Sequence, residues 1–466
     1  MKLSRIMLAA ASSGSGKTLI TCGLLQLLKD RGCDLCAFKC GPDYIDPMFH
    51  SKVLGLKSRN LDSFFTKSDV LRGLMAKNAK EADIAVVEGV MGYYDGLSGF
   101  SPKASAYDAA DITDTPVIFI VNCKGMSLSV IPYIKGFLEY KENSHIKGVI
   151  LNQLSPMLYK KMKEKIEGEL PVKVLGYVPK VDFTLESRHL GLVMPDEIED
   201  LKGQLSGLAD VLSKTLEVDE IIKLAKSAPA LDGNEEIISG FSSWSGFESA
   251  RQEPLKIGLA KDEAFCFFYE DNLQLLRDMG AELIEFSPVH DSHLPENISG
   301  LLLYGGYPEL LAKELSENTS MKGEIKAAIN AGLPTMAECG GFMYLHESMQ
   351  GADGNYYPMA GVIEGTVHKR NKLTRFGYIT LSEGKAFGKE IGTLPSHEFH
   401  YYDSENCGDA FFAQKPLSER NWRCMHSTDT MLAGYPHMYY CGNENLARAY
   451  MEAVLKYKRS KTEEGK

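Results

Sequence analysis

Short apolar runs alternate with amphipathic segments through the first half of the chain. The runs RIMLAAA, LCAFKCG, ADIAVVEGV, PVIFIVNC, IKGVILNQL and VKVLGYVP are nearly continuous, whereas GKTLITCGLLQLLKDRG carries its apolar residues at helical spacing. Continuous apolar strands are typical of strands buried on both faces, and intervening helices are typical of a parallel sheet. The pattern therefore predicts a doubly wound α/β domain over residues 1–227.

The pattern breaks at residue 228 and resumes after residue 253. The segment between, APALDGNEEIISGFSSWSGFESARQE, is rich in Gly, Ser and Glu and has no clear period, so we expect a linker at 228–253. Beyond it, KIGLAKDEAF, NLQLLRDMGAELIEFSP, ISGLLLYGGYP and LPTMAECGGFMYL restore the strand–helix alternation. A second α/β domain is predicted over 254–458, and the polar tail 459–466 is expected to be disordered.

Composition narrows the class of protein. The 466 residues carry a formal net charge of −11, which argues against nucleic acid as a partner because phosphate contacts need a basic surface. No apolar run reaches the roughly 18–20 residues of a membrane span. The start MKLSRIMLAAASSGSGK is similar to a secretory signal, but its short apolar part leads straight into Gly-Lys-Thr and reads as a first strand.

The ten cysteines raise a metal site as an alternative. Cys33, Cys36 and Cys40 have suitable spacing, but no second cluster of cysteine or histidine completes a ligand set. Reduced cysteines of a cytoplasmic α/β protein are the favoured interpretation.

The segment ASSGSGKT, residues 11–18, is similar to the phosphate-binding pattern G-x-x-x-x-G-K-[ST], with Ala11 at the first glycine position. Alanine is acceptable there if its φ is negative. A strand before the loop and a helix after it favour a nucleotide site over a plain Gly-Ser turn. The predicted ATP-binding residues of this loop are Gly14, Ser15, Gly16, Lys17 and Thr18.

Acidic residues follow two of the predicted strands. Asp43 and Asp46 lie in KCGPDYIDPMFH, where they either hold Mg²⁺ and substrate or are solvated acids of a turn. Glu88 closes the apolar run before GVMGYYDG, and Asp95 lies seven residues further on. Because burying a carboxylate is costly, Glu88 favours a functional role near Mg²⁺.

Cys339 lies between a predicted strand and a predicted helix. The spacing Ala337-x-Cys339-x-Gly341 is similar to a nucleophile elbow, with a thiol whose pKa a helix N-terminus would lower; an ordinary buried cysteine is the alternative. The N–H groups of Gly305 and Gly306, after another apolar run, could face an oxyanion. A cysteine nucleophile needs a histidine base, and the C-terminal candidates are His397, His400, His426 and His437.

Six segments together carry a resemblance to a known family. ASSGSGKT, KCGPDYIDPMFH, VVEGVMGYYDG, YGGYPEL, AECGGFMYL and SHEFHYYD occur in the order found in the cobyrinic acid a,c-diamide synthase family, and the chain resembles that family along nearly its whole length. The resemblance implies a dethiobiotin synthetase-like domain followed by a class I glutamine amidotransferase-like domain.

The resemblance also implies a reaction in cobalamin biosynthesis. Glutamine would be hydrolysed through a cysteine thioester in the C-terminal domain, and its ammonia would pass to the N-terminal domain. There ATP would phosphorylate the c- and then the a-acetate carboxylate of cobyrinate, and ammonia would displace phosphate. ATP, L-glutamine and Mg²⁺ are the substrates and cofactor that this implies.

Residue roles come with the resemblance. It implies that Cys339 is the nucleophile, that His437 in AGYPHMYYCGNENLARAYMEA is the base, and that the amides of Gly306 and Gly340 form the oxyanion hole. The other implied positions are Asp43, Tyr44, Ile45 and Asp95 for corrin binding or amidation, Asn152 for adenine, and Thr18, Asp46 and Glu88 for Mg²⁺.

Two residues depart from the pattern of the family, and the quoted segments leave a second substrate open. Tyr439 stands two residues after His437, where relatives carry histidine and most class I amidotransferases carry a glutamate that orients the base, so the partner of His437 is undetermined. Ile45 replaces a commoner leucine, which is a mild change. The same segments resemble an enzyme that amidates nickel-sirohydrochlorin toward coenzyme F430. A non-catalytic nucleotide switch is a further alternative, and small molecules are the expected partners, with a homodimer left open.

Overall fold

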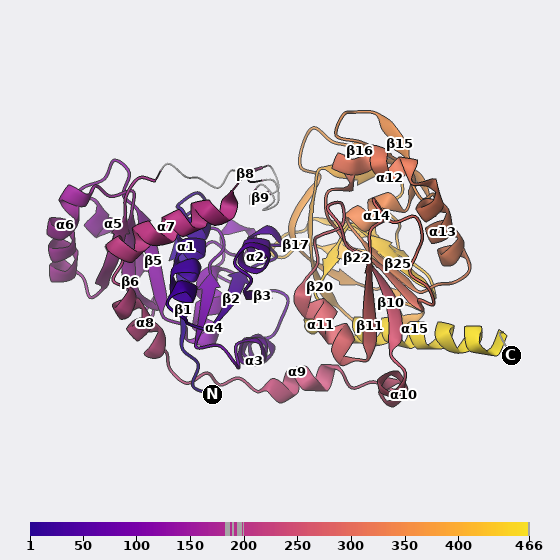
Figure 1. Ribbon diagram of the computed structural model, residues 1–466, viewed down its shortest axis with the longest axis horizontal. Helices are drawn as coiled ribbons and strands as arrows, with labels where there is room; N and C mark the ends of the chain where they lie inside the picture. The colour runs from indigo at the N-terminus through magenta and orange to yellow at the C-terminus, as the bar shows by residue number, and fades with distance from the viewer. Residues whose placement is uncertain (182–186, 189–190, 193–197, 199, 465–466) are drawn as a thin grey trace. The chain divides into compact units, whose positions relative to one another are not determined.

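The computed structural model describes residues 1–181, 187–188, 191–192, 198 and 200–464. The chain divides into two compact units, Met1–Ile238 and Ser239–Lys466 (Figure 1). No helix in the described part of the chain is long and apolar enough to cross a membrane.

The first unit is built on a seven-stranded, fully parallel sheet in the order β3-β2-β4-β1-β5-β6-β7. Every apolar run predicted as a strand in this half forms one. β3 was not predicted, because its sequence KSRNL is polar and it lies at the edge of the sheet. The bounds are β1 Arg5–Ala10, β2 Leu35–Cys40, β3 Lys57–Leu61, β4 Ile84–Glu88, β5 Val117–Asn122, β6 Ile146–Asn152 and β7 Lys173–Val178.

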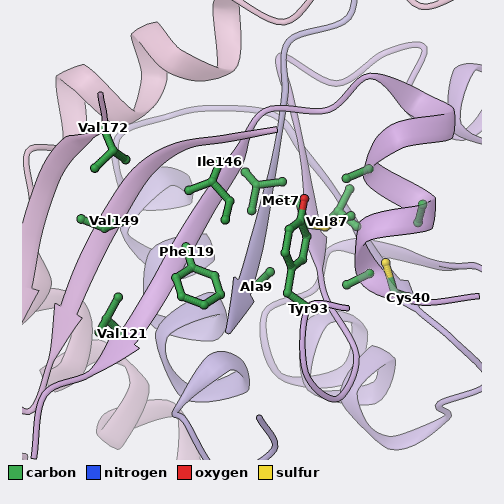
Figure 2. Packing of buried hydrophobic residues seen from close by; sticks show 14 of the residues in the cluster. Met7, Ala9, Cys40, Val87, Tyr93, Phe119, Val121, Ile146, Val149 and Val172 are labelled. Atoms are coloured by element: carbon green, nitrogen blue, oxygen red, sulfur yellow. The ribbon is translucent and has the colours of Figure 1, made fainter. Parts of the chain in front are cut away.

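Helices cover both faces of this sheet, as a doubly wound fold requires. On one face, Ala9, Phe119 and Val149 belong to a single core with the helices (Figure 2). These helices are α3 (Ser68–Asn78), α4 (Ala106–Thr113), α5 (Val130–Glu139) and α6 (Pro156–Glu169). The other face is covered by α1 (Lys17–Asp30) and α7 (Leu201–Thr215), which approach closely at Gly23, where a Cβ would lie 2.7 Å from Leu212 Cδ1.

The second unit contains a six-stranded sheet in the order β11-β10-β12-β13-β25-β24, parallel except for β24 at its edge. α12 (Ala312–Glu317) and α13 (Thr319–Asn330) share a core with one face, and α11 (Glu270–Asp278) and α15 (Glu444–Glu464) complete the α/β unit. The bounds are β10 Leu255–Ala260, β11 Ala281–Phe286, β12 Gly300–Leu303, β13 Thr335–Glu338, β24 His426–Ser427 and β25 Met431–Gly434.

In the described part of the second unit, two larger sheets and the short antiparallel pair β18 (Lys385–Ala386) and β19 (Lys389–Glu390) were not predicted. An antiparallel sheet has the order β23-β22-β17-β20-β26, and a mixed sheet has the order β15-β14-β16-β21. Their bounds are β14 His346–Gln350, β15 Tyr356–Pro358, β16 Ile363–Lys369, β17 Arg375–Ser382, β20 Leu394–His400, β21 Tyr402–Ser404, β22 Phe411–Gln414, β23 Asn421–Cys424 and β26 His437–Met438.

Two segments differ from their predicted character. The linker predicted at 228–253 contains two short helices, α9 (Glu235–Phe241) and α10 (Phe247–Gln252), and the Trp244 indole between them donates a 3.0 Å hydrogen bond to Met279 O. The tail, expected to be disordered from residue 459, continues α15 to Glu464. Lysine, arginine and glutamate are good helix formers, and extending an existing helix avoids the unfavourable nucleation step.

Arg5 closes the first unit around the start of β1. Its side chain is fully buried, and its guanidinium donates hydrogen bonds to Leu3 O (3.0 Å), Thr113 O (2.8 and 3.1 Å) and Pro229 O (2.8 Å). Pro229 follows α8 (Val218–Lys226), so one side chain ties the end of the unit to its first strand.

We expect Arg5→Met to lower the free energy of unfolding of the chain by roughly 3 kcal/mol, because it leaves buried carbonyl groups without a donor. Urea unfolding followed by fluorescence measures this change. Arg31→Met is the control, since Arg31 pairs with Asp219 at the surface (2.7 Å) and should change stability little. Equal stability of the two variants would contradict the role given to Arg5.

Candidate active sites

The loop between β1 and α1 has the backbone that a phosphate-binding loop needs. Gly14 and Gly16 adopt φ values of 76° and 88°, which favour glycine. Ala11 is absent from the described residues with positive φ, so alanine replaces the first glycine of the pattern without strain. Asn152, the last residue of β6, donates a 2.9 Å hydrogen bond to Ser15 O and so holds the loop from the end of a strand two places away from β1 in the sheet.

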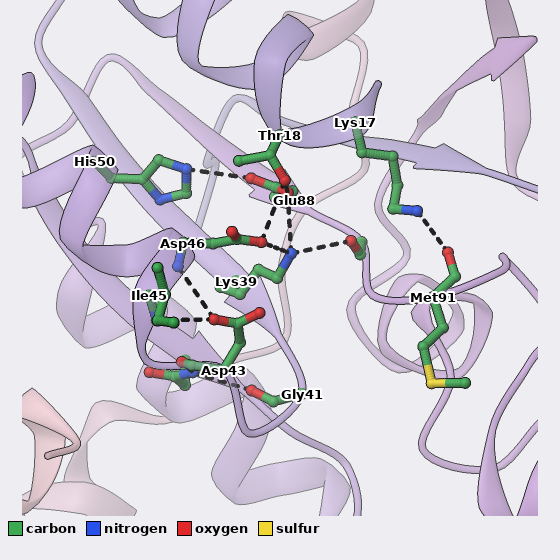
Figure 3. A network of polar contacts seen from close by, with 12 residues as sticks. Lys17, Thr18, Lys39, Gly41, Asp43, Ile45, Asp46, His50, Glu88 and Met91 are labelled. Carbon is green, nitrogen blue, oxygen red and sulfur yellow. Dashed lines mark hydrogen bonds and ion pairs between the residues drawn. The ribbon is translucent and has the colours of Figure 1, made fainter. Parts of the chain in front are cut away.

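Lys17 is held between the loop and the segment after β4. Its ammonium donates to Ser12 O (2.9 Å). It also donates to Met91 O (2.6 Å), as Figure 3 shows. Burial, reinforced by the nearby charge of Lys39, lowers the pKa of Lys17 to about 8. A bound polyphosphate would favour the charged form of this lysine.

Three side chains contact Glu88 at the end of β4, and Asp46 joins the cluster through two of them (Figure 3). Thr18 Oγ1 donates to Glu88 Oε1 (2.6 Å) and lies 3.3 Å from Asp46 Oδ2. Lys39 Nζ donates to the same Glu88 oxygen (2.9 Å) and to Asp46, and His50 Nε2 lies 3.3 Å from Glu88 Oε2. The predicted metal residues are therefore brought together, with two basic side chains that were not predicted.

Electrostatics keep Glu88 ionised inside this cluster. Burial by itself raises the pKa of Glu88, but Lys39, His50 and the Thr18 hydroxyl together lower it below its usual range. Burial likewise opposes the charge of Lys39, yet Asp46 and Glu88 raise its pKa well above the ordinary value. The cluster is thus a buried set of compensated charges rather than isolated ions.

The donor set fits Mg²⁺ bound together with phosphate. One hydroxyl and two carboxylates are ligands that Mg²⁺ prefers, and the ion commonly takes its remaining ligands from water and phosphate. No group of three or more His, Cys, Asp or Glu side chains in the described ranges is arranged to hold a metal alone, and the Cys33–Cys40 segment is no exception. Lys39 shares the carboxylate oxygens, so it is the group that must give up contacts to a cation.

The remaining predicted residues of the first unit lie on neighbouring loops. Asp43 Oδ1 accepts hydrogen bonds from the backbone N–H groups of Ile45 (2.9 Å) and Asp46 (3.1 Å), and so shapes the start of α2 (Ile45–Met48). Ile45 is buried, Tyr44 is half-buried, and Asp95 is exposed on the loop after β4. These loops follow the carboxyl ends of β2 and β4, which are adjacent strands.

In the second unit, Cys339 occupies a strained turn. It follows β13 with φ 46° and ψ −103° and precedes α14 (Gly340–Tyr344). Its backbone N–H donates to Gly434 O (2.8 Å), and a Cβ on Gly341 would collide with Leu303 O. A positive φ at a residue other than glycine, next to an obligatory glycine, is the geometry expected of a nucleophile elbow.

His437 meets Cys339 across Gly305. A Cβ on Gly305 would lie 2.7 Å from His437 Cε1 and 3.5 Å from Cys339 Cβ, so the glycine leaves room for both side chains. Burial opposes the charge of His437, but the hydrogen bond and charge of Cys339, together with Glu338, raise the pKa of His437 to about 10.

The two predicted oxyanion residues lie beside this pair. The amide nitrogen of Gly306 is 3.1 Å from the position of a Cβ on Gly340, so the two glycines are in close contact. A substituent on Gly306 would collide with Ala264 O, which explains the need for glycine at this turn.

The other candidate bases have different surroundings. His400 Nδ1 is paired with Tyr402 O (2.6 Å), and His426 Nε2 is paired with Asn406 O (3.0 Å). His397 is the cross-strand neighbour of His437, and burial lowers its pKa well below the ordinary value. Among the four histidines, His437 is the one hydrogen-bonded to Cys339.

Glu338 was not predicted as a site residue. It is the last residue of β13, is 2% exposed, and its Oε2 lies 3.7 Å from His437 Nδ1. Like Glu88 and Lys39, it is a charged residue at the end of an apolar strand, and that signal could have identified it from the sequence.

Comparisons with known proteins assign the family. Residues 6–192 match the CobQ/CobB/MinD/ParA nucleotide binding domain, and residues 256–445 match the CobB/CobQ-like glutamine amidotransferase domain. The protein named cobyrinate a,c-diamide synthase from Priestia megaterium is 35% identical over 97% of this chain and 97% of its own length. Proteins of the same name are 37% identical in Caldanaerobacter subterraneus (93% of this chain, 94% of the relative) and in Listeria innocua (95% and 97%).

The chain belongs to the cobyrinate a,c-diamide synthase family. Membership confirms the predicted fold class, a P-loop α/β domain followed by a class I glutamine amidotransferase-like α/β domain. It also makes the chain a glutamine-dependent amidotransferase ligase, and not the non-catalytic nucleotide switch that the loop alone allowed.

We expect the affinity for ATP to fall as the pH rises through about 8. Lys17 is charged below its pKa of about 8, so affinity is flat there; above it, binding requires uptake of a proton. The dissociation constant should rise by up to about tenfold per pH unit. Isothermal titration calorimetry in two buffers of different ionisation enthalpy measures both the affinity and the proton uptake.

Lys17→Gln is the control for this pH dependence. It has no charge to lose, so it should bind ATP weakly at every pH and without the proton uptake. An unchanged affinity of the wild-type chain up to about pH 9.5 would contradict the assignment of Lys17.

Proposed function

We propose that this chain converts the a- and c-acetate carboxylates of cobyrinate to amides, with ATP and glutamine-derived ammonia, in cobalamin biosynthesis. The relatives that carry the name cobyrinate a,c-diamide synthase cover both halves of the chain. The observation that carries the proposal is the presence in one chain of the Cys339–His437 pair and of a phosphate-binding loop next to Glu88.

The second unit supplies ammonia in this proposal. Cys339 Sγ attacks the side-chain carbonyl carbon of glutamine after His437 takes the thiol proton, and His437 returns that proton to the leaving ammonia. The N–H groups of Gly306 and Gly340 stabilise the oxyanion. Water then hydrolyses the thioester to glutamate and frees the thiol.

The first unit activates the carboxylate. A carboxylate resists attack by ammonia, whereas an acyl phosphate does not, so transfer of the γ-phosphoryl group of ATP precedes amide formation. Each amidation releases ADP and phosphate, first at the c- and then at the a-acetate. The loop amides and the Lys17 ammonium hold the triphosphate. When bound, Mg²⁺ neutralises phosphate charge, and Thr18, Asp46 and Glu88 would hold it.

The loops beside the cluster are proposed to hold the corrin. Asp43, Tyr44 and Ile45 follow β2, and Asp95 follows β4, at the carboxyl ends of adjacent strands where ligands of such sheets bind. Asn152 is proposed to contact adenine from the end of β6, next to the loop whose Ser15 carbonyl it holds.

Product analysis by mass spectrometry tests the substrate. Cobyrinate, hydrogenobyrinate and nickel-sirohydrochlorin are each offered with ATP, Mg²⁺ and glutamine. We expect a diamide from cobyrinate. Conversion of nickel-sirohydrochlorin alone would contradict the proposal and assign the chain to coenzyme F430 synthesis instead.

Cys339→Ala should separate the two chemistries. Without the thiol, glutamine hydrolysis and glutamine-dependent amidation should fall by at least about 10³-fold. Amidation with added ammonium should persist, because the phosphate-binding loop and the carboxylate cluster are unchanged. Glutamate release and product amidation are measured side by side.

Cys424→Ala is the matched control, since Cys424 is also a buried cysteine of the second unit. It should retain glutamine-dependent activity. Glutamine hydrolysis that survives in Cys339→Ala would show that the nucleophile has been assigned wrongly.

A further inference from the structure

The base His437 needs a group at its second ring nitrogen. A histidine that accepts a proton from a thiol must hold one tautomer and must be stabilised when it becomes an imidazolium. Tyr439, at the position of the usual glutamate, does not do this: its Oη donates a 2.8 Å hydrogen bond to Asp271 Oδ2.

We propose that Glu338 is the positioning residue for His437: its carboxylate accepts the Nδ1 proton and stabilises the imidazolium that forms when Cys339 becomes a thiolate. This inference rests on the proposed glutamine hydrolysis at Cys339. Glu338 directly precedes the nucleophile Cys339 in the chain. The glutamate of most class I amidotransferases instead lies two residues after the base, at the position of Tyr439.

The distances and burial of Glu338 support this role. Its Oε2 lies 3.7 Å from His437 Nδ1 and accepts a 3.4 Å hydrogen bond from the Met438 N–H, while its Oε1 is buried and accepts none from any described residue. A buried carboxylate with so few donors is costly unless a neighbouring group becomes cationic. Catalytic hydrogen bonds are often long before substrate binds and then shorten.

The turn at Cys339 explains how consecutive residues reach one imidazole. In a continuing strand, Glu338 and Cys339 would point to opposite faces of the sheet. The strand instead ends at Glu338, whose register partner is Gly434, and Cys339 turns away with φ 46°. Both side chains therefore approach His437: the carboxylate lies 3.7 Å from Nδ1, and the thiol is hydrogen-bonded to the same imidazole.

Three further side chains of the second unit interact electrostatically with Glu338 or His437. Besides Cys339, the charge of Glu338 reaches the hydroxyl groups of Tyr304 and Tyr440, which share a 2.7 Å hydrogen bond with one another, and His437 is faced by His397. Burial raises the pKa values of both tyrosines well above the ordinary range and lowers that of His397 well below it.

Glu338→Gln removes the charge and keeps the shape. We expect kcat for glutamine hydrolysis to fall by about 10²- to 10⁴-fold with little change in KM. The alkaline limb of the kcat/KM profile reports loss of the imidazolium proton, so removal of a carboxylate that raises the pKa of His437 should move this limb to lower pH by about one unit or more. Glutamate release across the pH range measures both effects.

Two further variants separate positioning from structure. Glu338→Asp retains the charge at a shorter reach, so its alkaline limb should lie closer to that of the wild-type chain than the limb of Glu338→Gln does. Glu324→Gln is the matched control, because Glu324 also faces an imidazole Nδ1, that of His293, but at the surface of the same unit. Its profile should equal that of the wild-type chain.

The outcomes are distinct. A Glu338→Gln variant whose activity or alkaline limb equals that of the wild-type chain overturns the inference, as does a loss of activity with an unshifted limb. Ammonium-dependent amidation, measured in every variant, shows that the chain has folded. A wild-type chain that hydrolyses no glutamine would instead overturn the proposed function.

Discussion

A carboxylate buried at the last residue of a parallel strand is the constraint on which both sites depend. Glu88 ends β4 and Glu338 ends β13, and neither is more than 2% exposed. Removing one partner from a buried ion pair typically costs about 3–5 kcal/mol, so each carboxylate fixes the positions of the groups around it. At Glu88 these are Lys39, Thr18 and His50; at Glu338 they are His437 and the Met438 N–H.

The turns that follow β1 and β13 hold the groups that are proposed to bind phosphate and to attack glutamine. In the first unit, the turn after β1 has two glycines at positive φ, Gly14 and Gly16, which is the backbone that a phosphate-binding loop needs. In the second unit, the residue at positive φ after β13 is Cys339 itself, the residue that we propose as the nucleophile. One architecture, a parallel strand that turns into a helix, is thus proposed to hold a phosphate in one unit and a nucleophile in the other.

Local hydrophobic patterns predicted most of the strands in the seven-stranded parallel sheet. The strands that were missed include ones that are polar and ones that pair with segments far away in the chain. Continuous apolar runs gave β1, β2, β4, β5, β6 and β7, whereas the polar edge strand β3 carries no such signal. The five-stranded antiparallel sheet of the second unit pairs distant segments of mixed polarity, such as β20 with β26, which local periodicity does not reveal.

The site residues likewise divide into those that lie in local sequence motifs and those that do not. Lys17, Thr18 and Cys339 lie in patterns that can be read locally, whereas His437 was one histidine among four candidates until the family resemblance selected it. Lys39 contacts Glu88, and Glu338 lies near His437; these partners lie too far apart along the chain for a local pattern to pair them.

If the two units act as proposed, the nitrogen released from glutamine at Cys339 is the nitrogen incorporated into the amides at the first unit. Glutamine labelled with ¹⁵N in its side-chain amide tests this directly, with ATP, Mg²⁺ and cobyrinate and a low concentration of unlabelled ammonium. The account predicts a diamide labelled at both amides and one ADP released for each amide formed. An unlabelled diamide, or label released as ammonia without any incorporation, would contradict it.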